Sequence, residues 1–385
     1  MLNFSFENQT RIHFGEGQIA AITNEIPKDA KVLVTYGGGS IKTNGVYDQV
    51  VNALKDHTWF EFSGIEPNPK YDTLMKAQAV IKEHAIDYLL AVGGGSVADG
   101  TKFIAGVALF EGAEPWDILA KQQKIKSALP IGVVLTLPAT GSETNPNGVV
   151  TRDGNKLPFS SSAVRPQFAV LDPAVTLSLS DRQISNGVVD AFIHTMEQYL
   201  TYSVNAKVQD RFAEGLLLTL IEEGPKALLA ESKEDLDVRA NIMWSATMAL
   251  NGLIGAGVPQ DWATHMIGHE LTGNYGIDHA RTLSIVLPAV MKVCKEAKHD
   301  KLLQYAQRVW QVSEGSEEQQ IEQAIQLKED FFQRMAMPIR LSDIELGEAD
   351  IDLLMSKLES HGMVALGEKK AVSLAISRQI LTTAL

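Results

Sequence analysis

Cysteine is almost absent from this chain. Cys294 is the only one among 385 residues, so the chain can form no intrachain disulfide, no zinc ribbon and no redox-active cysteine pair. No apolar run reaches the roughly 18 residues that cross a bilayer, and residues 1–10 lack the basic and apolar segments of a secretory signal. These absences predict a cytoplasmic protein without a membrane partner.

Positive charge is also scarce. The sequence has 34 Lys and Arg against 47 Asp and Glu, a formal net charge of −13. Such a chain repels polyanions, which disfavours nucleic acid and anionic membranes as partners. With 45% hydrophobic residues it can bury a substantial core, and its length accommodates two or three domains. We therefore expect a globular protein that acts on small molecules.

The first half of the chain alternates apolar runs with helical patterns. Runs of this length, apolar on both faces and separated by helices, are typical of parallel strands with βα crossovers. The predicted strands are residues 31–36, 86–92, 131–137 and 168–172, and the clearest helical patterns are 70–84 and 97–110. This half is predicted to be an α/β domain.

Beyond residue 180 the pattern becomes helical. Apolar residues recur at three- and four-residue spacing, as at Phe212, Leu216 and Leu220, which indicates amphipathic helices. The boundary falls near Ser180, which can cap a helix while Gln183 bonds back to it. We predict an α/β domain over 1–178 and an all-helical domain over 179–385.

Two predicted strands end in the same four residues, Gly-Gly-Gly-Ser. A pyrophosphate needs backbone N–H groups that can approach closely, and a following helix N-terminus adds a favourable dipole. Gly clusters after strands can also be simple tight turns, and neither cluster is a GxGxxG fingerprint. The two clusters are Gly37, Gly38, Gly39, Ser40 and Gly93, Gly94, Gly95, Ser96.

A third polar segment follows the strand at 131–137. It carries Thr136, Thr140, Ser142 and Asn145. Because ligands gather at the carboxyl ends of parallel strands, the three segments together favour a nucleotide site. Clusters of Thr, Ser and Asn are also often turns that bond to themselves.

The helical half concentrates potential metal ligands. Asp190 and His194 are four residues apart and would share a helix face, and His265 and His269 repeat that spacing. His279 follows Gly273 and Gly276, which we expect to break the helix and return the chain to the same point.

These side chains suit zinc, iron and other first-row divalent metals, and the absence of thiolate does not decide between them. A single such pair is more often a surface pair or a core histidine. Both pairs beside a nucleotide-type half favour a metal site. The zinc-protease motif HExxH is excluded because Met266 replaces its glutamate.

Taken in order, these residues resemble the iron-containing (group III) alcohol dehydrogenase family, in particular its NADPH-dependent aldehyde reductase and butanol dehydrogenase branch. The resemblance covers essentially the whole chain. It implies a dehydroquinate synthase-like fold, with an N-terminal Rossmann-like dinucleotide-binding domain, a C-terminal helical metal-binding domain and the site in the cleft between them. The landmarks are residues 14–17 (FGEG), 66–69 (EPNP), 93–102 (GGGSVADGTK), 137–145 (LPATGSETN), 187–194 (GVVDAFIH) and 265–279.

The resemblance also implies residue roles. The metal ligands would be Asp190, His194, His265 and His279, binding one divalent metal, Fe²⁺ or Zn²⁺. His269 would face the site without binding the metal. The cofactor contacts would be Gly94, Gly95 and Ser96 at the pyrophosphate, Asp99 near the nicotinamide, Thr136, Thr140, Ser142 and Asn145 in the third segment, and Lys156 at the nicotinamide ribose.

The implied activity is hydride transfer between a nicotinamide cofactor and a small aldehyde or alcohol, with a metal ion polarising the carbonyl. The proton would pass through His269 or the cofactor ribose. A polyol- or glycerol-type dehydrogenase, a metal-dependent lyase and a non-catalytic nucleotide-binding protein stay open as alternatives. Family members are often homodimers, and residues 3–14 could pair across such an interface.

The cofactor preference is argued from a missing carboxylate. Many NAD-using relatives place an aspartate after the first strand to bind the adenosine ribose, whereas Gly37–Ser40 supplies none. Ser40 and Lys42 can bond a 2′-phosphate. We therefore predict NADP(H) in preference to NAD(H).

Overall fold

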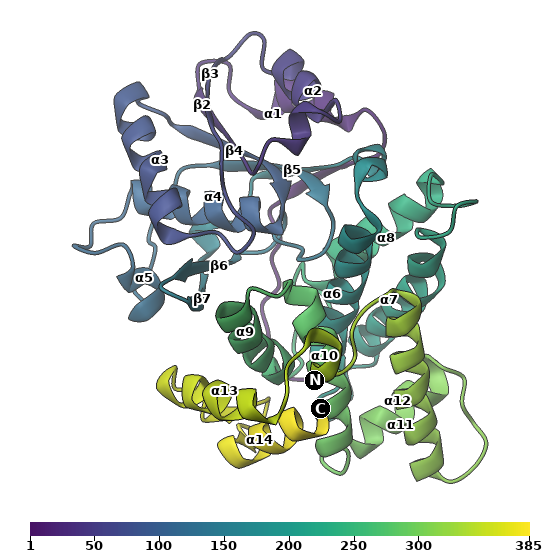
Figure 1. Ribbon diagram of the computed structural model, residues 1–385. Coiled ribbons are helices and arrows are strands. Elements are labelled where there is room, and N and C mark those ends of the chain that lie inside the picture. Colours follow the sequence, from purple (N-terminus) through teal and green to yellow (C-terminus); the bar gives the residue numbers. More distant parts are fainter. The chain divides into compact units, whose positions relative to one another are not determined.

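The first half of the chain builds a parallel sheet in the computed structural model, which describes residues 1–385 (Figure 1). All neighbouring strands are parallel, and their order is β1-β8-β5-β4-β2-β3. The predicted α/β fold is confirmed. The strands are β1 (Arg11–Phe14), β2 (Lys31–Tyr36), β3 (Thr58–Phe62), β4 (Tyr88–Gly94), β5 (Ile131–Leu137) and β8 (Phe168–Leu171).

The sheet is covered on both faces, which explains why its strands are apolar throughout. Along β2, Leu33 packs with α3 (Tyr71–His84) and α4 (Gly95–Ala108) on one face. Val32 and Val34 pack on the opposite face with η1 (Gln18–Ala21), α1 (Ile22–Glu25) and α2 (Val46–Ala53). Side chains of a strand point alternately to its two faces, so a strand buried on both sides shows no polar alternation.

The strand order reverses at β2. The chain passes from β2 to β3 on one side and then to β4 on the other, which creates the topological switch point where open α/β sheets bind ligands. The loops after β2, β4 and β5 therefore leave neighbouring strands at one edge of the sheet. The remaining elements of this half are α5 (Asp117–Ala120), the antiparallel hairpin of β6 (Asn147–Arg152) and β7 (Asn155–Ser160), η2 (Ser40–Lys42), η3 (Ser162–Val164) and η4 (Pro173–Ser178).

The second half is mainly helical, as predicted. The cap at Ser180 is confirmed: its Oγ accepts from the Gln183 N–H at 3.3 Å, and Gln183 Oε1 accepts from the Ser180 N–H at 3.1 Å. The helices are α6 (Asp181–Tyr199), α7 (Lys207–Lys226), α8 (Leu236–Ala249), α9 (Ala263–Tyr275), α10 (His279–Val293), α11 (His299–Arg308), α12 (Glu317–Arg334), η5 (Leu341–Ile344), α13 (Glu348–Ser360) and α14 (Leu374–Thr383).

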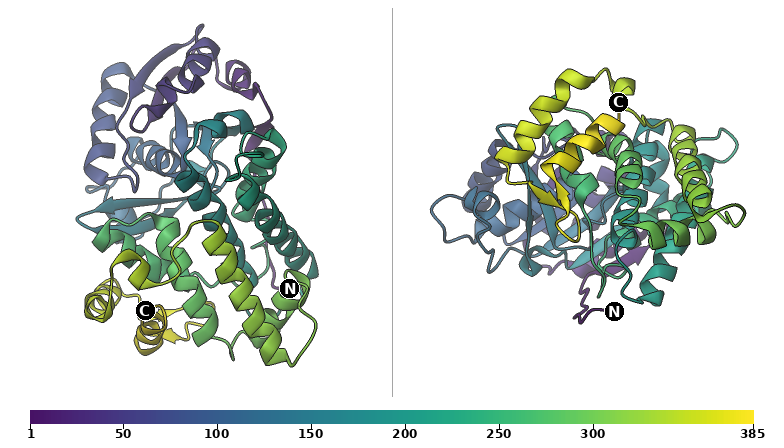
Figure 2. Two further views of the ribbon diagram at one scale, coloured as in Figure 1. Left: turned by 45° about the vertical axis from the view of Figure 1, so that its right-hand side comes forward. Right: turned by 90° about the horizontal axis from the view of Figure 1, so that it is seen from below.

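One expectation for this half needs correction. It is not entirely helical, because β9 (Ala365–Leu366) and β10 (Val372–Ser373) form an antiparallel pair that leads into α14, yellow in Figure 2. Strands of two residues are too short to show an alternating pattern, so no pattern in the sequence predicted them.

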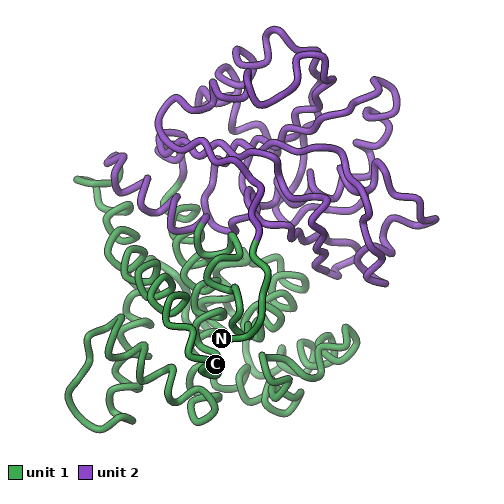
Figure 3. The backbone as a smooth tube through the Cα atoms, turned by 180° about the vertical axis from the view of Figure 1, so that it is seen from behind, with its two compact units in different colours: residues 1–6, 180–233, 248–385 green, residues 7–179, 234–247 purple.

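The chain forms two compact units that are not continuous in sequence (Figure 3). Unit 1 comprises residues 1–6, 180–233 and 248–385, and unit 2 comprises 7–179 and 234–247. Most of α8 thus belongs with the sheet, where Met243 packs against Leu135 and Leu171. None of the helices combines the length and apolar composition needed to cross a bilayer.

Candidate functional site

Helix α6 carries the first pair of predicted ligands. Asp190 and His194 are 4% and 5% exposed, and His194 Nδ1 lies 3.9 Å from Asp190 Oδ1. The four-residue spacing places both on one face of the helix, as expected. The same face is buried, so both polar groups lie inside unit 1.

The turn between α9 and α10 brings in the other histidines. Gly276 ends α9 with a φ of 68°, a left-handed conformation that glycine adopts without strain. Gly273 lies inside α9, so the expectation that it also breaks the helix is wrong. His279 then begins α10, and its Nε2 lies 3.9 Å from Asp190 Oδ1.

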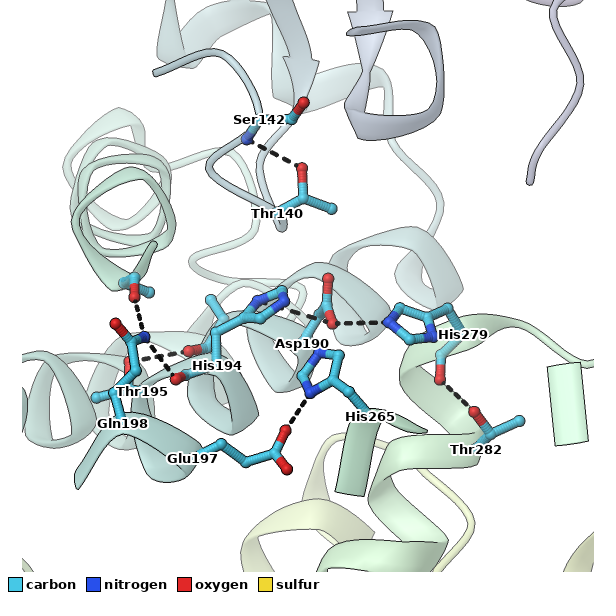
Figure 4. A network of polar contacts seen from close by, with 12 residues as sticks. Thr140, Ser142, Asp190, His194, Thr195, Glu197, Gln198, His265, His279 and Thr282 are labelled. Carbon is cyan, nitrogen blue, oxygen red and sulfur yellow. Dashed lines mark hydrogen bonds and ion pairs between the residues drawn. The ribbon is translucent and has the colours of Figure 1, made fainter. Parts of the chain in front are cut away.

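Three predicted ligands form a tight group (Figure 4). Potential ligand atoms of Asp190, His265 and His279 all lie within 4.8 Å of one another. The ring of His194 stacks on that of His265, with centroids 4.6 Å apart. Neither His194 nor His269 belongs to this group of three. The ring centroid of His269 lies 5.0 Å from that of His279 and 6.2 Å from that of His265.

The group has the properties of a metal site. The donors are one carboxylate and imidazole nitrogens, which bind iron and zinc. Atoms that each lie about 2.0–2.2 Å from one cation are at most roughly 4.4 Å apart, and the two 3.9 Å separations at Asp190 satisfy this limit. Asp190 Oδ1 is buried without a hydrogen bond, which is costly unless a cation compensates it.

Sequence reasoning missed Glu197, which supports this group. Its carboxylate is hydrogen-bonded to His265 Nδ1, and its Oε1 accepts from the Thr264 N–H at 2.6 Å. Burial and then the charge of Asp261 raise the pKa of Glu197 to about 8, although the Thr264 N–H acts in the opposite direction. The available signal was spacing, because 190, 194 and 197 lie on one stripe of α6.

Trp262 adds an apolar wall beside these ligands. Its ring centroid lies 5.2 Å from that of His265 and 6.2 Å from that of His194. The backbone of Trp262 is in the left-handed region, with a φ of 63°. This conformation is uncommon for a bulky residue and is found mostly at functional sites.

In unit 2, the second glycine cluster lies directly against the third polar segment. A Cβ on Gly95 would lie 2.5 Å from Thr140 Oγ1, so only glycine fits there. Ser96 Oγ accepts from the Asn68 N–H at 3.3 Å, which joins the EPNP motif to the same loop. Gly94 ends β4 and caps α4, which begins at Gly95, so the predicted arrangement of glycines at a helix N-terminus is present.

The third segment is partly bonded to itself. Thr140 Oγ1 accepts from the Ser142 N–H, and the Thr140 carbonyl accepts from Asn145 Nδ2, both at 3.2 Å. Ser142 Oγ also donates to Asp99 Oδ1 at 2.5 Å. Thr136 is half-buried at the end of β5.

The carboxylate of Asp99 interacts with several neighbouring polar groups. Its Oδ2 accepts from the Val149 N–H at 3.0 Å. Burial raises its pKa, while the charges of Lys102 and Lys156 lower it, so Lys156 on β7 acts on the same carboxylate. The structure thus brings Asp99 and Ser142 into direct contact and places Lys156 near enough for its charge to act on Asp99.

Sequence reasoning also missed Lys102, one turn after Asp99 on α4. It is fully buried, and burial lowers its pKa to about 8 although Asp99 and Glu143 raise it. Its role could have been suspected from its position as the last residue of the motif GGGSVADGTK.

The first glycine cluster continues into η2, where Lys42 has an acidic partner. Lys42 Nζ lies 2.9 Å from Glu61 Oε2 and over the ring of Tyr47. Tyr36 also donates to Glu61 Oε2, at 2.5 Å. Because Glu61 comes from β3, the neighbour of β2, sequence spacing gave no sign of this contact.

Comparison with protein families supports one assignment. Residues 9–173 match the model described as iron-containing alcohol dehydrogenase. Residues 184–365 match the model described as the C-terminal region of the Fe-containing alcohol dehydrogenase family.

Individual relatives match over the full length. The chain is 57% identical over 388 residues to the NADPH-dependent aldehyde reductase YqhD of Escherichia coli K12, covering 100% of both chains. It is 40% identical to a probable NADH-dependent butanol dehydrogenase of Bacillus subtilis, covering 94% of this chain and 95% of the relative.

Solved structures agree with this. The crystal structure of E. coli YqhD superposes with a TM-score of 0.98, 56% identity and coverage of 100% and 99% of the two chains. That of the NADH-dependent butanol dehydrogenase A of Thermotoga maritima gives 0.95 at 37% identity, with the same coverage.

Proposed function

The chain belongs to the iron-containing alcohol dehydrogenase family, and from this membership we propose that it is an oxidoreductase that reduces small aldehydes to primary alcohols with NADPH, and catalyses the reverse reaction. The observation that carries the proposal is the group of Asp190, His265 and His279, of which the first two are buried and the third is half-buried. A relative that had lost catalysis would have no reason to retain a buried carboxylate oxygen without a hydrogen bond.

We assign the binding of one divalent metal, Fe²⁺ or Zn²⁺, to Asp190, His194, His265 and His279. When bound, the metal ion polarises the substrate carbonyl as a Lewis acid. Glu197 holds His265 by its Nδ1, which leaves the other ring nitrogen for the metal. Trp262 packs its ring edge-to-face with that of His265 beside these ligands. His269, 9% exposed, is the residue we assign to proton transfer.

The cofactor is assigned to the loops of unit 2. Gly37–Ser40, Gly94–Ser96 and the segment from Thr136 to Asn145 would bind the nucleotide, with Asp99 and Lys156 toward the nicotinamide. Relatives named for NADPH and for NADH both match this chain, so the choice rests on its own residues. The first cluster itself has no carboxylate, and Lys42 follows it, where a 2′-phosphate would compete with Glu61 for the ammonium group. This pairing favours NADPH.

We also propose the assembly and organisation. A homodimer is supported by exposed apolar side chains near the N-terminus, and by β1, an edge strand whose unpaired backbone groups can take a partner strand. These side chains are Met1, Leu2, Phe4 and Phe6. Sedimentation equilibrium tests the assembly.

The division into domains 1–178 and 179–385 and the cytoplasmic location are retained as proposals.

The experiment combines metal analysis with an aldehyde panel followed by NADPH absorbance. We expect the purified protein to contain about one metal ion per chain and to oxidise NADPH with short aldehydes. Asp190→Ala and His265→Ala should lose metal and activity together while still binding NADPH. His299→Ala is the control, because it changes a half-buried histidine of the same unit that lies outside the proposed ligands. Full activity in metal-free protein would refute the proposal.

A further inference from the structure

Lys102 is buried where a charge is unfavourable, yet its hydrogen bonds are complete. Its side chain is 0% exposed, and an ammonium group has three N–H donors. They meet Ser142 Oγ at 2.7 Å, Asn145 Oδ1 at 3.2 Å and the Asn147 carbonyl oxygen at 2.6 Å. All three acceptors belong to the segment that follows β5.

The same segment is held from a second point on α4. Asp99 accepts from Ser142 Oγ with one carboxylate oxygen, at 2.5 Å, and from the Val149 N–H with the other, at 3.0 Å. Asp99 and Lys102 are three residues apart and so lie on one face of α4. One helix face therefore holds the segment from Ser142 to Val149 by five hydrogen bonds. Lys102 donates three of them, and Asp99 accepts the other two.

Ser142 and Asn145 belong to a segment without regular structure, whereas Asn147 and Val149 lie at the start of β6. Residues 138–146 lie between β5 and β6 and belong to no helix or strand. Such a segment loses conformational freedom when it binds a ligand unless it is already ordered. A buried charge that replaces a well-packed apolar side chain seldom adds stability, so ordering of this segment is a better reason for Lys102.

We propose that Lys102 is a positioning residue that holds the segment from Ser142 to Asn147 in the conformation that receives the nicotinamide cofactor. This rests on the proposed function. Because its side chain is fully buried, Lys102 acts through Ser142 and Asn145. Glu143 and Thr144, which lie between Ser142 and Asn145, have other partners. Thr247 Oγ1 donates to Glu143 Oε1 at 2.6 Å, and Arg165 donates to the Thr144 carbonyl oxygen at 2.8 Å. Lys102 therefore orients the side chains of Ser142 and Asn145.

The test compares two fully buried lysines. Lys102→Met keeps the length of the side chain and removes every donor. Lys328→Met is the matched control, because Lys328 is also 0% exposed, lies in unit 1, and its Nζ makes no hydrogen bond. NADPH affinity is measured by titration of the purified proteins, with kcat, the KM for NADPH, metal content and thermal unfolding alongside.

We expect Lys102→Met to weaken NADPH binding and raise its KM on the order of ten- to a hundredfold, the loss typical of hydrogen bonds to a charged group. Its kcat at saturating NADPH should change less than about threefold, and its metal content should match that of the wild type. Lys102→Gln, which keeps two N–H donors, should lie between the two. Lys328→Met should bind NADPH like the wild type.

Wild-type NADPH affinity in Lys102→Met, whatever its thermal stability, would overturn the proposal. Failure of both Lys102→Met and Lys102→Gln to fold would also overturn it, because the lysine would then be a folding requirement. Both results are distinct from failure of the proposed function, in which the wild-type protein itself would bind no nicotinamide nucleotide.

Discussion

Replacing Glu197 by Gln tests how the metal group is held. In the wild type, Glu197 Oε1 accepts a hydrogen bond from the Thr264 N–H at 2.6 Å. In the variant, the amide oxygen can still accept from His265 Nδ1, but the amide nitrogen is a donor and would face the Thr264 N–H. One buried donor loses its acceptor, and the ring of His265 loses the carboxylate that fixes its orientation and raises its basicity.

The expected magnitude follows from such outer partners in metal sites. Their removal typically lowers metal affinity by about 10- to 100-fold, which corresponds to about 1.4–2.7 kcal/mol. Glu197 is only 3% exposed, so water cannot take over its role, and we expect a loss in the upper part of this range. The fold should survive because the substitution preserves volume.

The assay is a titration of metal-free protein with Zn²⁺ or Co²⁺ in competition with a coloured chelator. Glu270→Gln is the matched control. Glu270 is also a buried glutamate, and its Oε1 lies 2.7 Å from Nδ1 of a different histidine, His361. Unchanged metal affinity in Glu197→Gln, or an equal loss in Glu270→Gln, would refute the idea that Glu197 acts on the metal through His265.

Three further changes test separate parts of the molecule. His269→Ala should retain metal, because His269 is not one of the four proposed ligands, but should alter the pH–rate profile; an unaltered profile rules out its proton role. Glu61→Gln removes the carboxylate that competes for Lys42 and should lower the KM for NADPH up to about fivefold, the scale of an exposed ion pair, while leaving that for NADH unchanged; an equal effect on both would contradict recognition of the 2′-phosphate by Lys42. Lys328→Met should stabilise the fold by about 1–4 kcal/mol at neutral pH. Burial, opposed by Glu329 and reinforced by Lys292 and Arg340, lowers the pKa of Lys328 well below 10.5. The unfolded chain therefore binds more protons than the folded chain between that lowered pKa and 10.5, and stability rises with pH across this window. The advantage of Lys328→Met should shrink as the pH approaches 10.5, measured by urea unfolding, and a constant advantage would show that the charge of Lys328 is not its cause.

Local patterns predicted the elements well because their causes are local. The run from Lys31 to Tyr36 forms a strand with the expected bounds, since burial on both faces requires apolar residues throughout. The cap at Ser180 and the shared face of Asp190 and His194 depend only on helical geometry. Even so, Gly273 was misjudged as a helix breaker, because its cost is about 1 kcal/mol inside a helix and the packing of α9 exceeds it.

Contacts between distant residues could not be predicted in this way. Glu197 and His265 are 68 positions apart, and Lys102 and Ser142 are 40 apart, so no spacing rule connects them. The placement of α8 with the sheet of unit 2 has the same origin. Its helical period is visible in the sequence, but the fact that Met243 packs against Leu135 depends on tertiary structure.

The two buried lysines show what burial alone can tell. Lys102 and Lys328 have the same exposed fraction, and desolvation lowers the pKa of both. They differ in hydrogen bonding, because Lys102 meets three acceptors on one segment whereas Lys328 lies over the ring of Phe332 at 5.4 Å and donates to none. A buried charge that orders no other group can be replaced by an apolar side chain, whereas one that orders a loop cannot. Lys102→Met should therefore change the affinity for the cofactor, whereas Lys328→Met should change only the stability of the fold.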